Sequence, residues 1–348
     1  MALRRVTKFG RWLAIGVLGV LVLLAAAPVS ADPGPNPGDN VKTPNAADWP
    51  AEFLTWVRVV NRTYTQSAPN GRRIQLLDSW DTWLGVQETR VVDGETWYRV
   101  GDDRWVYADD TEKAEISPLR GYHFQGTENG QFGIVVADPA MVHESASLSA
   151  ATVGQLKRYT PVFVTAHDSG WLQVAGQGWV ANDDLRLMRT TPRPDGVGPE
   201  DKWIDVDLTN QTVAAYEGDK IIFATLSSTG KDPTPTKTGL FYIYQKKIGE
   251  FMAGGWADHD PYVLEEVPWT MYFTENYALH GAYWHDKFGE VRSHGCVNLT
   301  PEDAKFLFTW TGPVLPPGQV GVKSSPDNLG TWVYVHDSHE QYSEDLLP

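Results

Sequence analysis

Residues 280–298 read HGAYWHDKFGEVRSHGCVN and contain the single cysteine of the 348-residue chain, Cys296. Gly295 stands directly before this thiol, and glycine allows the backbone to adopt conformations that are closed to other residues. A tight turn at this point can direct successive backbone N–H groups toward one place, which is what an oxyanion hole requires. The stretch therefore predicts a loop that presents a nucleophilic thiol.

A thiol needs a base or a positive neighbour to become reactive near neutral pH. Adjacent side chains of an extended segment point to opposite faces, so His294 is poorly placed to act on its near neighbour. His280, sixteen residues before Cys296, is the better base if its segment folds back beside the turn. A Cys/His pairing alone is a weak signal, and a buried, inert thiol is the alternative for a lone cysteine.

The complete arrangement is more specific than the pairing. His280-Gly281, the twelve residues from Gly281 to Arg292, and the following SHGCVN (293–298) resemble the signature of the L,D-transpeptidase catalytic domain family. Lys237 stands where relatives often have a second proline. The other stretches that agree with the family are Ser228-Thr229-Gly230, residues 234–239 (TPTKTG) with Phe241, residues 268–273 (PWTMYF), and residues 282–285 (AYWH) with Phe288-Gly289.

The resemblance implies a β-sandwich with a nucleophile in a groove, an enzyme that needs no cofactor, and peptidoglycan stem peptides as substrates. Cys296 would form a thioester and His280 would transfer the protons. A backbone carbonyl near Ser293 would orient the imidazole. The remaining implied site residues are His294 and Gly295 at the oxyanion, and Asn298, Tyr272 and Trp284 in the groove. The resemblance also implies covalent trapping by carbapenems.

Three of these roles have structural alternatives. His294 could fix the turn by hydrogen bonding, and Ser293 could do the same. Trp284 could pack in the core. A metal site formed by His259, His280, His285 and His294 matches no zinc ligand spacing, so none is expected.

Residues from about 55 to 188 alternate short apolar runs with turn residues, which is typical of all-β structure. The pattern W-x-x-V-x-x-x-x-W-V-x-x-D-D occurs at residues 97–110 and again at 171–184, an offset of 74. The two stretches, 56–110 and 134–188, resemble bacterial Src-homology-3-like modules, and the second does so more closely. Their tryptophans are expected to fill small barrels, and the modules are expected to bind the cell-wall polymer without taking part in the chemistry. Spacers, or a lid packed on the groove, are the alternatives.

The remaining boundaries follow from local composition. Residues 1–31 combine basic residues, the uncharged run 12–27 and a small-residue site ending at Ala31, which predicts a cleaved export signal and an extracytoplasmic location in the cell wall or periplasm. An uncleaved anchor is the alternative; after cleavage no stable membrane insertion is expected. The other predicted segments are a Pro-rich tether at 32–55, a linker at 189–201, the catalytic domain at 202–337 and an acidic tail at 338–348.

Within the catalytic domain, alternating residues predict strands at 203–207, 213–216, 221–226 and 331–336. Thr300 suits a helix N-cap, with Pro301 at the first helical position and Gly312-Pro313 as the stop. The predicted fold is therefore mainly β, with two small Src-homology-3-like barrels followed by a β-sandwich that has one short helix.

Composition excludes several classes of protein. The chain has 29 Lys+Arg and 44 Asp+Glu, for a formal net charge of −15. Loss of residues 1–31, which hold four cations and no acid, would take that charge to −19. Because nucleic-acid affinity depends on neutralising phosphates, a nucleic-acid partner is excluded. A hydrophobic content of 42% excludes a wholly disordered chain, and one cysteine excludes a disulfide framework.

Four functions are compatible with these features. The first is a secreted L,D-transpeptidase that forms 3→3 cross-links between stem peptides. The second is an L,D-carboxypeptidase or exchange enzyme that uses the same acyl-enzyme. The third is a wall-binding protein with an inactive catalytic domain, and the fourth is an anchor cross-linked through Cys296. The intact His280 and SHGCVN set favours the enzymes.

Overall fold

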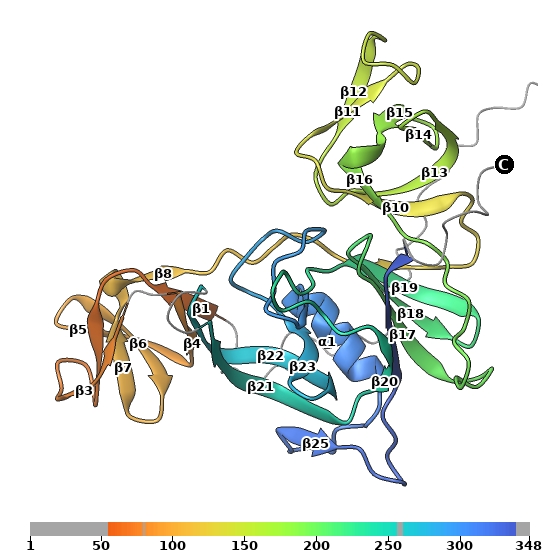
Figure 1. Ribbon diagram of the computed structural model, residues 1–348. Helices are drawn as coiled ribbons and strands as arrows, with labels where there is room; N and C mark the ends of the chain where they lie inside the picture. Colours follow the sequence, from red (N-terminus) through yellow and green to blue (C-terminus); the bar gives the residue numbers. More distant parts are fainter. Residues whose placement is uncertain (1–54, 79–80, 256–259, 339–348) are drawn as a thin grey trace, which may run out of the picture. The chain divides into compact units, whose positions relative to one another are not determined.

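The computed structural model describes residues 55–78, 81–255 and 260–338 (Figure 1). These residues form mostly strands and, within that part of the chain, a single α-helix. The predicted export signal, the tether up to residue 54 and the tail from residue 339 lie outside the described residues. No helix among the described residues is long and apolar enough to cross a bilayer.

Two upstream modules have similar orders of elements, with one strand more in the first, and their last three elements are offset by 74 residues each. We call residues 55–113 the first module and residues 131–187 the second module. The elements of the first are β1 (Thr55–Val59), β2 (Thr63–Gln66), β3 (Arg73–Leu77), β4 (Thr82–Val86), β5 (Glu88–Val92), β6 (Glu95–Gly101), β7 (Arg104–Tyr107), the 3-10 turn η4 (Ala108–Asp110) and β8 (Thr111–Lys113). Those of the second are β10 (Gln131–Val135), β11 (Ala140–His143), β12 (Thr152–Leu156), β13 (Pro161–Asp168), β14 (Trp171–Val174), β15 (Gly178–Ala181), η5 (Asn182–Asp184) and β16 (Leu185–Leu187).

The repeated tryptophans lie outside the core cluster of each module, although Trp97 and Trp105 of the first module are buried. Aliphatic side chains form each interior, among them Val100 and Val106 in the first module and their counterparts in the second. Side chains alternate between the two faces of a strand, so Trp97 and Trp105 point away from the face that holds Val100 and Val106. Trp105 instead lies beneath the Arg90 guanidinium, 4.5 Å from its ring centre.

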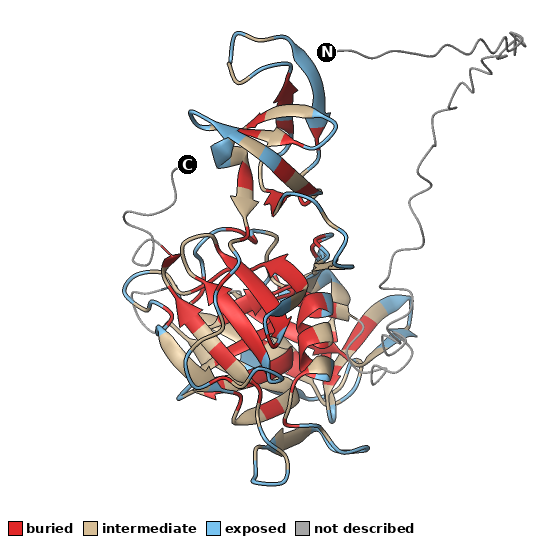
Figure 2. Cartoon of the chain, turned by 90° about the vertical axis from the view of Figure 1, so that its right-hand side faces the viewer, coloured by how far each residue is buried: buried red, intermediate tan, exposed pale blue. Residues whose placement is uncertain are grey.

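The catalytic region is a sandwich of two sheets, and its predicted strands are confirmed. One sheet has the order β20 (Gly239–Tyr242), β26 (Trp332–His336), β17 (Lys202–Asp207), β18 (Thr212–Glu217), β19 (Lys220–Leu226) and β9 (Tyr122–His123). The other has the order β24 (Val297–Leu299), β23 (Tyr277–Gly281), β22 (Tyr262–Thr274), β4, β1 and β8, with β21 (Gln245–Gly254) on β22 and β25 (Gly321–Lys323) on β21. Figure 2 shows buried residues along both sheets and the helix between them.

Helix α1 (Pro301–Trp310) begins as predicted. The Thr300 hydroxyl accepts the Asp303 N–H at 3.1 Å, and Pro301 occupies the first turn. The buried Asp303 carboxylate then accepts the Thr225 hydroxyl at 2.6 Å and the Gly121 N–H at 2.9 Å. This segment between the two modules, with β9, therefore belongs to the catalytic sandwich.

The boundaries between modules and sandwich are packed rather than open. In the linker at 189–201, the Val197 side chain is buried in the core. The Thr191 hydroxyl of the same linker donates a hydrogen bond to the Asp205 carboxylate at 3.0 Å. Strand β4 of the first module pairs in parallel with β22 of the sandwich, so the two share one sheet. The first module is therefore in direct backbone contact with the catalytic sandwich.

Candidate active site

Cys296 and His280 lie on neighbouring segments of the second sheet. Strands β23 and β24 are parallel, and their register places Leu279 opposite Val297 and His280 opposite Asn298. Cys296 immediately precedes β24. It is therefore two residues from Asn298, which pairs with His280. Both residues line a pocket of about 530 Å³, and the thiol is only half-buried. The predicted return of the His280 segment beside the turn is confirmed.

The turn before the thiol is held by its own side chains. Gly295 has a φ of 121°, and a Cβ at this position would lie 2.6 Å from a ring carbon of Tyr277. The Ser293 hydroxyl accepts the Gly295 N–H at 3.1 Å and donates to the Cys296 carbonyl. The Thr236 hydroxyl donates to the Gly295 carbonyl at 2.7 Å. These bonds use the Gly295 N–H within the turn, so the Cys296 N–H is the better oxyanion donor.

His280 is positioned by a different carbonyl from the one expected. Its Nδ1 lies 3.3 Å from the Gly281 carbonyl, while the Ser293 carbonyl accepts the N–H of Lys231 at 2.9 Å. A carbonyl can only accept, so in the neutral ring Nδ1 carries the proton and Nε2 keeps a lone pair. That tautomer can accept a proton from a thiol.

Burial holds both groups neutral near pH 7. The imidazole of His280 is 2% exposed, and burial lowers its pKa to about 4, against a smaller opposite effect of the Gly281 carbonyl. Burial also raises the pKa of the Cys296 thiol to about 11, although the Ala278 N–H partly opposes this. The resting pair is therefore a thiol beside a neutral base.

All of the other predicted site residues except Gly295 line the same pocket. The His294 ring packs on Tyr262 with centroids 4.9 Å apart. The Trp284 ring lies 5.7 Å from that of His280. The Tyr272 hydroxyl donates to Glu250 at 3.3 Å, and the Asn298 amide nitrogen lies 3.0 Å from Nε2 of His285.

Several lining residues were not identified from the sequence. Asp81 comes from the first module, about 200 positions before the cysteine, and no sequence signal linked it to the site. Tyr262 and Met252 come from the β21–β22 hairpin, whose length was not recognised. Arg292 belongs to the quoted stretch but received no role. Lys237, noted only as a departure from the family, pairs with Glu275 at 2.6 Å near the pocket.

The described residues contain no group of three or more His, Cys, Asp or Glu side chains that could hold a metal ion. His259, one of the four histidines considered for a metal, lies outside them. His280, His285 and His294 do line one pocket. Their rings contact a carbonyl, an amide and an aromatic ring, respectively.

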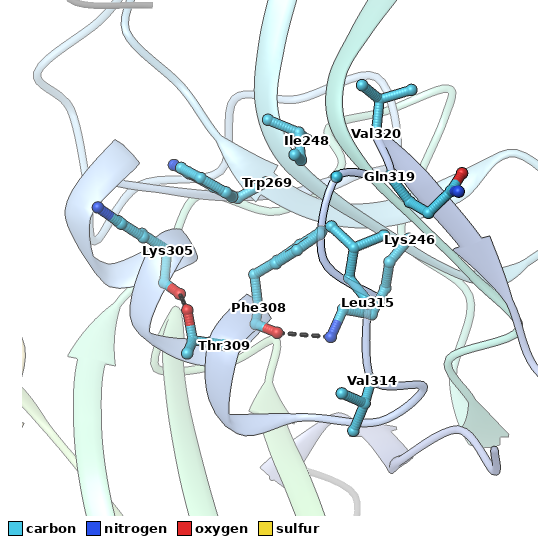
Figure 3. Close-up of a pocket in the computed structure, with 11 residues that line it drawn as sticks. Lys246, Ile248, Trp269, Lys305, Phe308, Thr309, Val314, Leu315, Gln319 and Val320 are labelled. Carbon is cyan, nitrogen blue, oxygen red and sulfur yellow. Dashed lines mark hydrogen bonds between the residues drawn. The ribbon is translucent and has the colours of Figure 1, made fainter. Parts of the chain in front are cut away.

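A second cavity of about 510 Å³ lies beside helix α1 and contains none of the predicted site residues (Figure 3). Lys246 is fully buried there, and its ammonium group donates to the carbonyls of Phe308 and Thr311, the latter at 2.8 Å. Burial lowers the pKa of Lys246 to about 7. These carbonyls belong to the last turn of the helix, where a cation is favoured, so Lys246 stabilises the end of α1.

Comparison with known proteins agrees with this arrangement. Residues 201–335 match the family model of the L,D-transpeptidase catalytic domain, and residues 139–186 match that of the bacterial SH3 domain. A Bacillus subtilis (strain 168) protein named "Putative L,D-transpeptidase YciB" is 29% identical over 119 residues, which cover 30% of this chain and 59% of the relative. This chain thus spans less than two thirds of that protein's length.

Two solved structures are also similar. The L,D-transpeptidase from Stackebrandtia nassauensis is 28% identical, with 40% of this chain and 57% of that chain covered and a TM-score of 0.29. The catalytic domain of the E. faecium L,D-transpeptidase, acylated by ertapenem, is 29% identical, with 39% and 98% covered and a TM-score of 0.30. By its sequence, the chain is therefore similar to the L,D-transpeptidase catalytic domain at residues 201–335 and to the bacterial SH3 domain at residues 139–186.

Proposed function

We propose that this protein is an exported L,D-transpeptidase that forms 3→3 cross-links between peptidoglycan stem peptides through a thioester on Cys296. The observation that carries the proposal is the position of Cys296 and His280 on adjacent segments of one pocket, inside the matched catalytic domain. The partly exposed thiol can meet a substrate carbonyl, and the buried imidazole has a lone pair to receive its proton.

In the first step, the Cys296 sulfur attacks the carbonyl of the third, diamino residue of a tetrapeptide stem. The thiol proton passes to Nε2 of His280, and the oxyanion is held by the Cys296 N–H. The C–N bond to the D-Ala at position four then breaks, His280 returns the proton to the leaving amine, and a thioester remains.

In the second step, the side-chain amine of a neighbouring stem attacks the thioester. His280 takes a proton from that amine and returns it to the sulfur, so the enzyme is restored and the new bond joins two third residues. Attack by water or by a free amino acid would instead give a carboxypeptidase or exchange product. The second module, with the bacterial SH3 match, would hold the enzyme on the wall polymer, where weak contacts suffice to raise local concentration.

The direct test is intact mass spectrometry of the protein after mixing with muropeptides. We expect an acyl-enzyme that has lost D-Ala, followed by a dimer linked through third residues. A hydrolysed tripeptide as the only product would assign the carboxypeptidase activity. Absence of both the adduct and any product would favour an inactive wall-binding protein.

Carbapenems should trap the same thiol, because such β-lactams resemble the acyl donor and leave a stable thioester. We expect incubation with ertapenem to add one carbapenem to the protein, on the peptide that contains Cys296, as found by peptide mapping. The Cys296→Ala protein is the matched control and should gain no mass. An adduct on another peptide would contradict the proposed nucleophile.

The pH dependence of turnover should report the low pKa of His280. The imidazole must be neutral to accept the thiol proton, so kcat/KM is expected to rise with pH through about 4 and to be flat from about 5 to about 9. Circular dichroism at each pH controls for unfolding. An acid limb near pH 6.5, the ordinary value for histidine, would show that the imidazole is not held neutral by burial.

A further inference from the structure

The first module is joined to the catalytic sandwich by backbone pairing. Strand β4 runs parallel to β22, with Thr82 opposite Val263 and Trp83 opposite Leu264 (Figure 1). The Val263 N–H also donates to the Asp81 carbonyl at 3.1 Å. Paired backbones fix the register of the two strands, so Asp81 has a defined position beside β22.

Side-chain contacts also join the first module to the catalytic sandwich. The Trp56 indole N–H donates to the Glu266 carbonyl at 3.2 Å, and its ring stacks on Tyr283 with centroids 4.6 Å apart. Arg104 of the first module pairs with Glu265 at 2.9 Å, and both side chains are mostly buried. Stacked aromatics and a sheltered ion pair resist separation of the two parts more than a loop contact would.

The strand that receives the first module also forms part of the pocket. Tyr262 and Leu264 of β22 line it together with Cys296, and Asp81 lines it from the module side. The first module therefore contributes one lining residue, Asp81, to the groove that holds the nucleophile.

The carboxylates that line this groove differ in how fully their oxygens are engaged. Two carboxylates line it in the described part of the chain, Asp81 and Asp260. The Lys231 ammonium group forms an ion pair with the Asp260 carboxylate at 2.8 Å. Asp81 uses one oxygen, Oδ1, for the Trp83 indole N–H at 2.9 Å, with Arg58 3.9 Å from that same oxygen. Among the residues that the structure describes, none donates a hydrogen bond to its second oxygen, Oδ2, and the side chain is 43% exposed.

We propose that Asp81 recognises the cationic side-chain amine of the stem peptide's third residue, so that the first module determines which stems the pocket accepts. This inference rests on the proposed function for the identity of the substrate. The amine is protonated near neutral pH until it reacts, and a carboxylate with an unused oxygen at the groove edge is its natural partner. Asp81 is thus a specificity residue supplied by the first module, not a catalytic one.

The test is a binding measurement that does not depend on turnover. The full mature chain carrying Cys296→Ala is titrated with a tetrapeptide stem whose third residue has a free side-chain amine, and with the same stem acetylated on that amine. We expect Asp81→Asn to weaken binding of the free-amine stem roughly three- to tenfold and to leave the acetylated stem unchanged, as suits a partly exposed charge pair. Added salt should weaken the free-amine stem alone.

Asp93→Asn is the matched control, because Asp93 is an exposed carboxylate in a turn of the same module and does not line the pocket. The Asp81→Asn side chain keeps an oxygen for the Trp83 indole, so this variant is expected to fold, which thermal unfolding checks. Equal affinity of the two stems for the parent protein, or equal losses for both in Asp81→Asn, would overturn the inference. Amine-dependent binding in a protein that makes no cross-links would instead contradict the proposed function and leave the role of Asp81 standing.

Discussion

Replacement of Cys296 by alanine is expected to reduce cross-linking by about 10⁴-fold or more, to the background level, while the protein stays folded. The reason is that the sulfur forms the covalent bond in the first step, and no other nucleophilic side chain occupies its position before β24. The loss is measured from the formation of cross-linked dimer by chromatography of muropeptide products. The side chain is half-buried, and its polar contacts are with two backbone groups, the Asn276 carbonyl at 3.7 Å and the Ala278 N–H, so little stability should be lost.

Cys296→Ser separates the chemistry from the shape of the site. It preserves the size of the side chain, yet a hydroxyl is far harder to deprotonate than a thiol, so we expect it to be nearly as inactive as alanine. Its unfolding temperature should match that of the parent protein. Normal cross-linking by the alanine protein would remove Cys296 from the mechanism altogether.

Replacement of His280 by alanine should reduce kcat/KM by roughly 10²–10⁴-fold, the usual contribution of a positioned general base. Nε2 of this ring is the acceptor that the thiol proton needs, because Nδ1 is directed to the Gly281 carbonyl. The rate of acylation by ertapenem, followed by intact mass, should fall with the cross-linking rate. The acid limb near pH 4 should disappear from whatever activity remains.

His285→Ala is the matched control, since His285 lines the same pocket and burial also lowers its pKa, to about 3. Its ring contacts the Asn298 amide, so its loss should cost about tenfold or less through a displaced groove residue. Equal losses for the two histidines would mean that the general base has been misassigned.

The catalytic sandwich could be predicted from the sequence because its signals are local. Alternation in residues 203–226 predicted strands β17 to β19, and Thr300 with Pro301 predicted the start of α1. The stretch around Cys296 placed the nucleophile and the base, since a parallel strand pair is a simple way to return His280 to the turn.

What the sequence could not indicate depends on contacts between distant residues. Trp97 and Trp105 lie on the strand face opposite the aliphatic core because side chains alternate between the two faces. The residue types alone do not indicate which of the two faces is turned toward the core. The pairing of β4 with β22 joins segments about 180 residues apart. The sequence of an edge strand does not identify the strand with which it pairs. The resemblance implied an orienting carbonyl near Ser293, whereas the contact with the Gly281 carbonyl depends on the side-chain conformation of His280, which the residue types do not fix.

The docking of β4 on β22 also bears on how the two modules have diverged. Their last three elements are offset by 74 residues each, as expected of a duplicated unit, but only in the first copy does the strand after the repeated hairpin turn begin with an arginine. Arg104 opens β7 and binds Glu265, while the residue that opens the corresponding strand β15 is Gly178. A chimera in which the second module replaced the first would keep the barrel and lose this attachment. The copy beside the catalytic groove is therefore constrained on its outer surface as well as in its core, whereas the other copy is free of that constraint at the equivalent position.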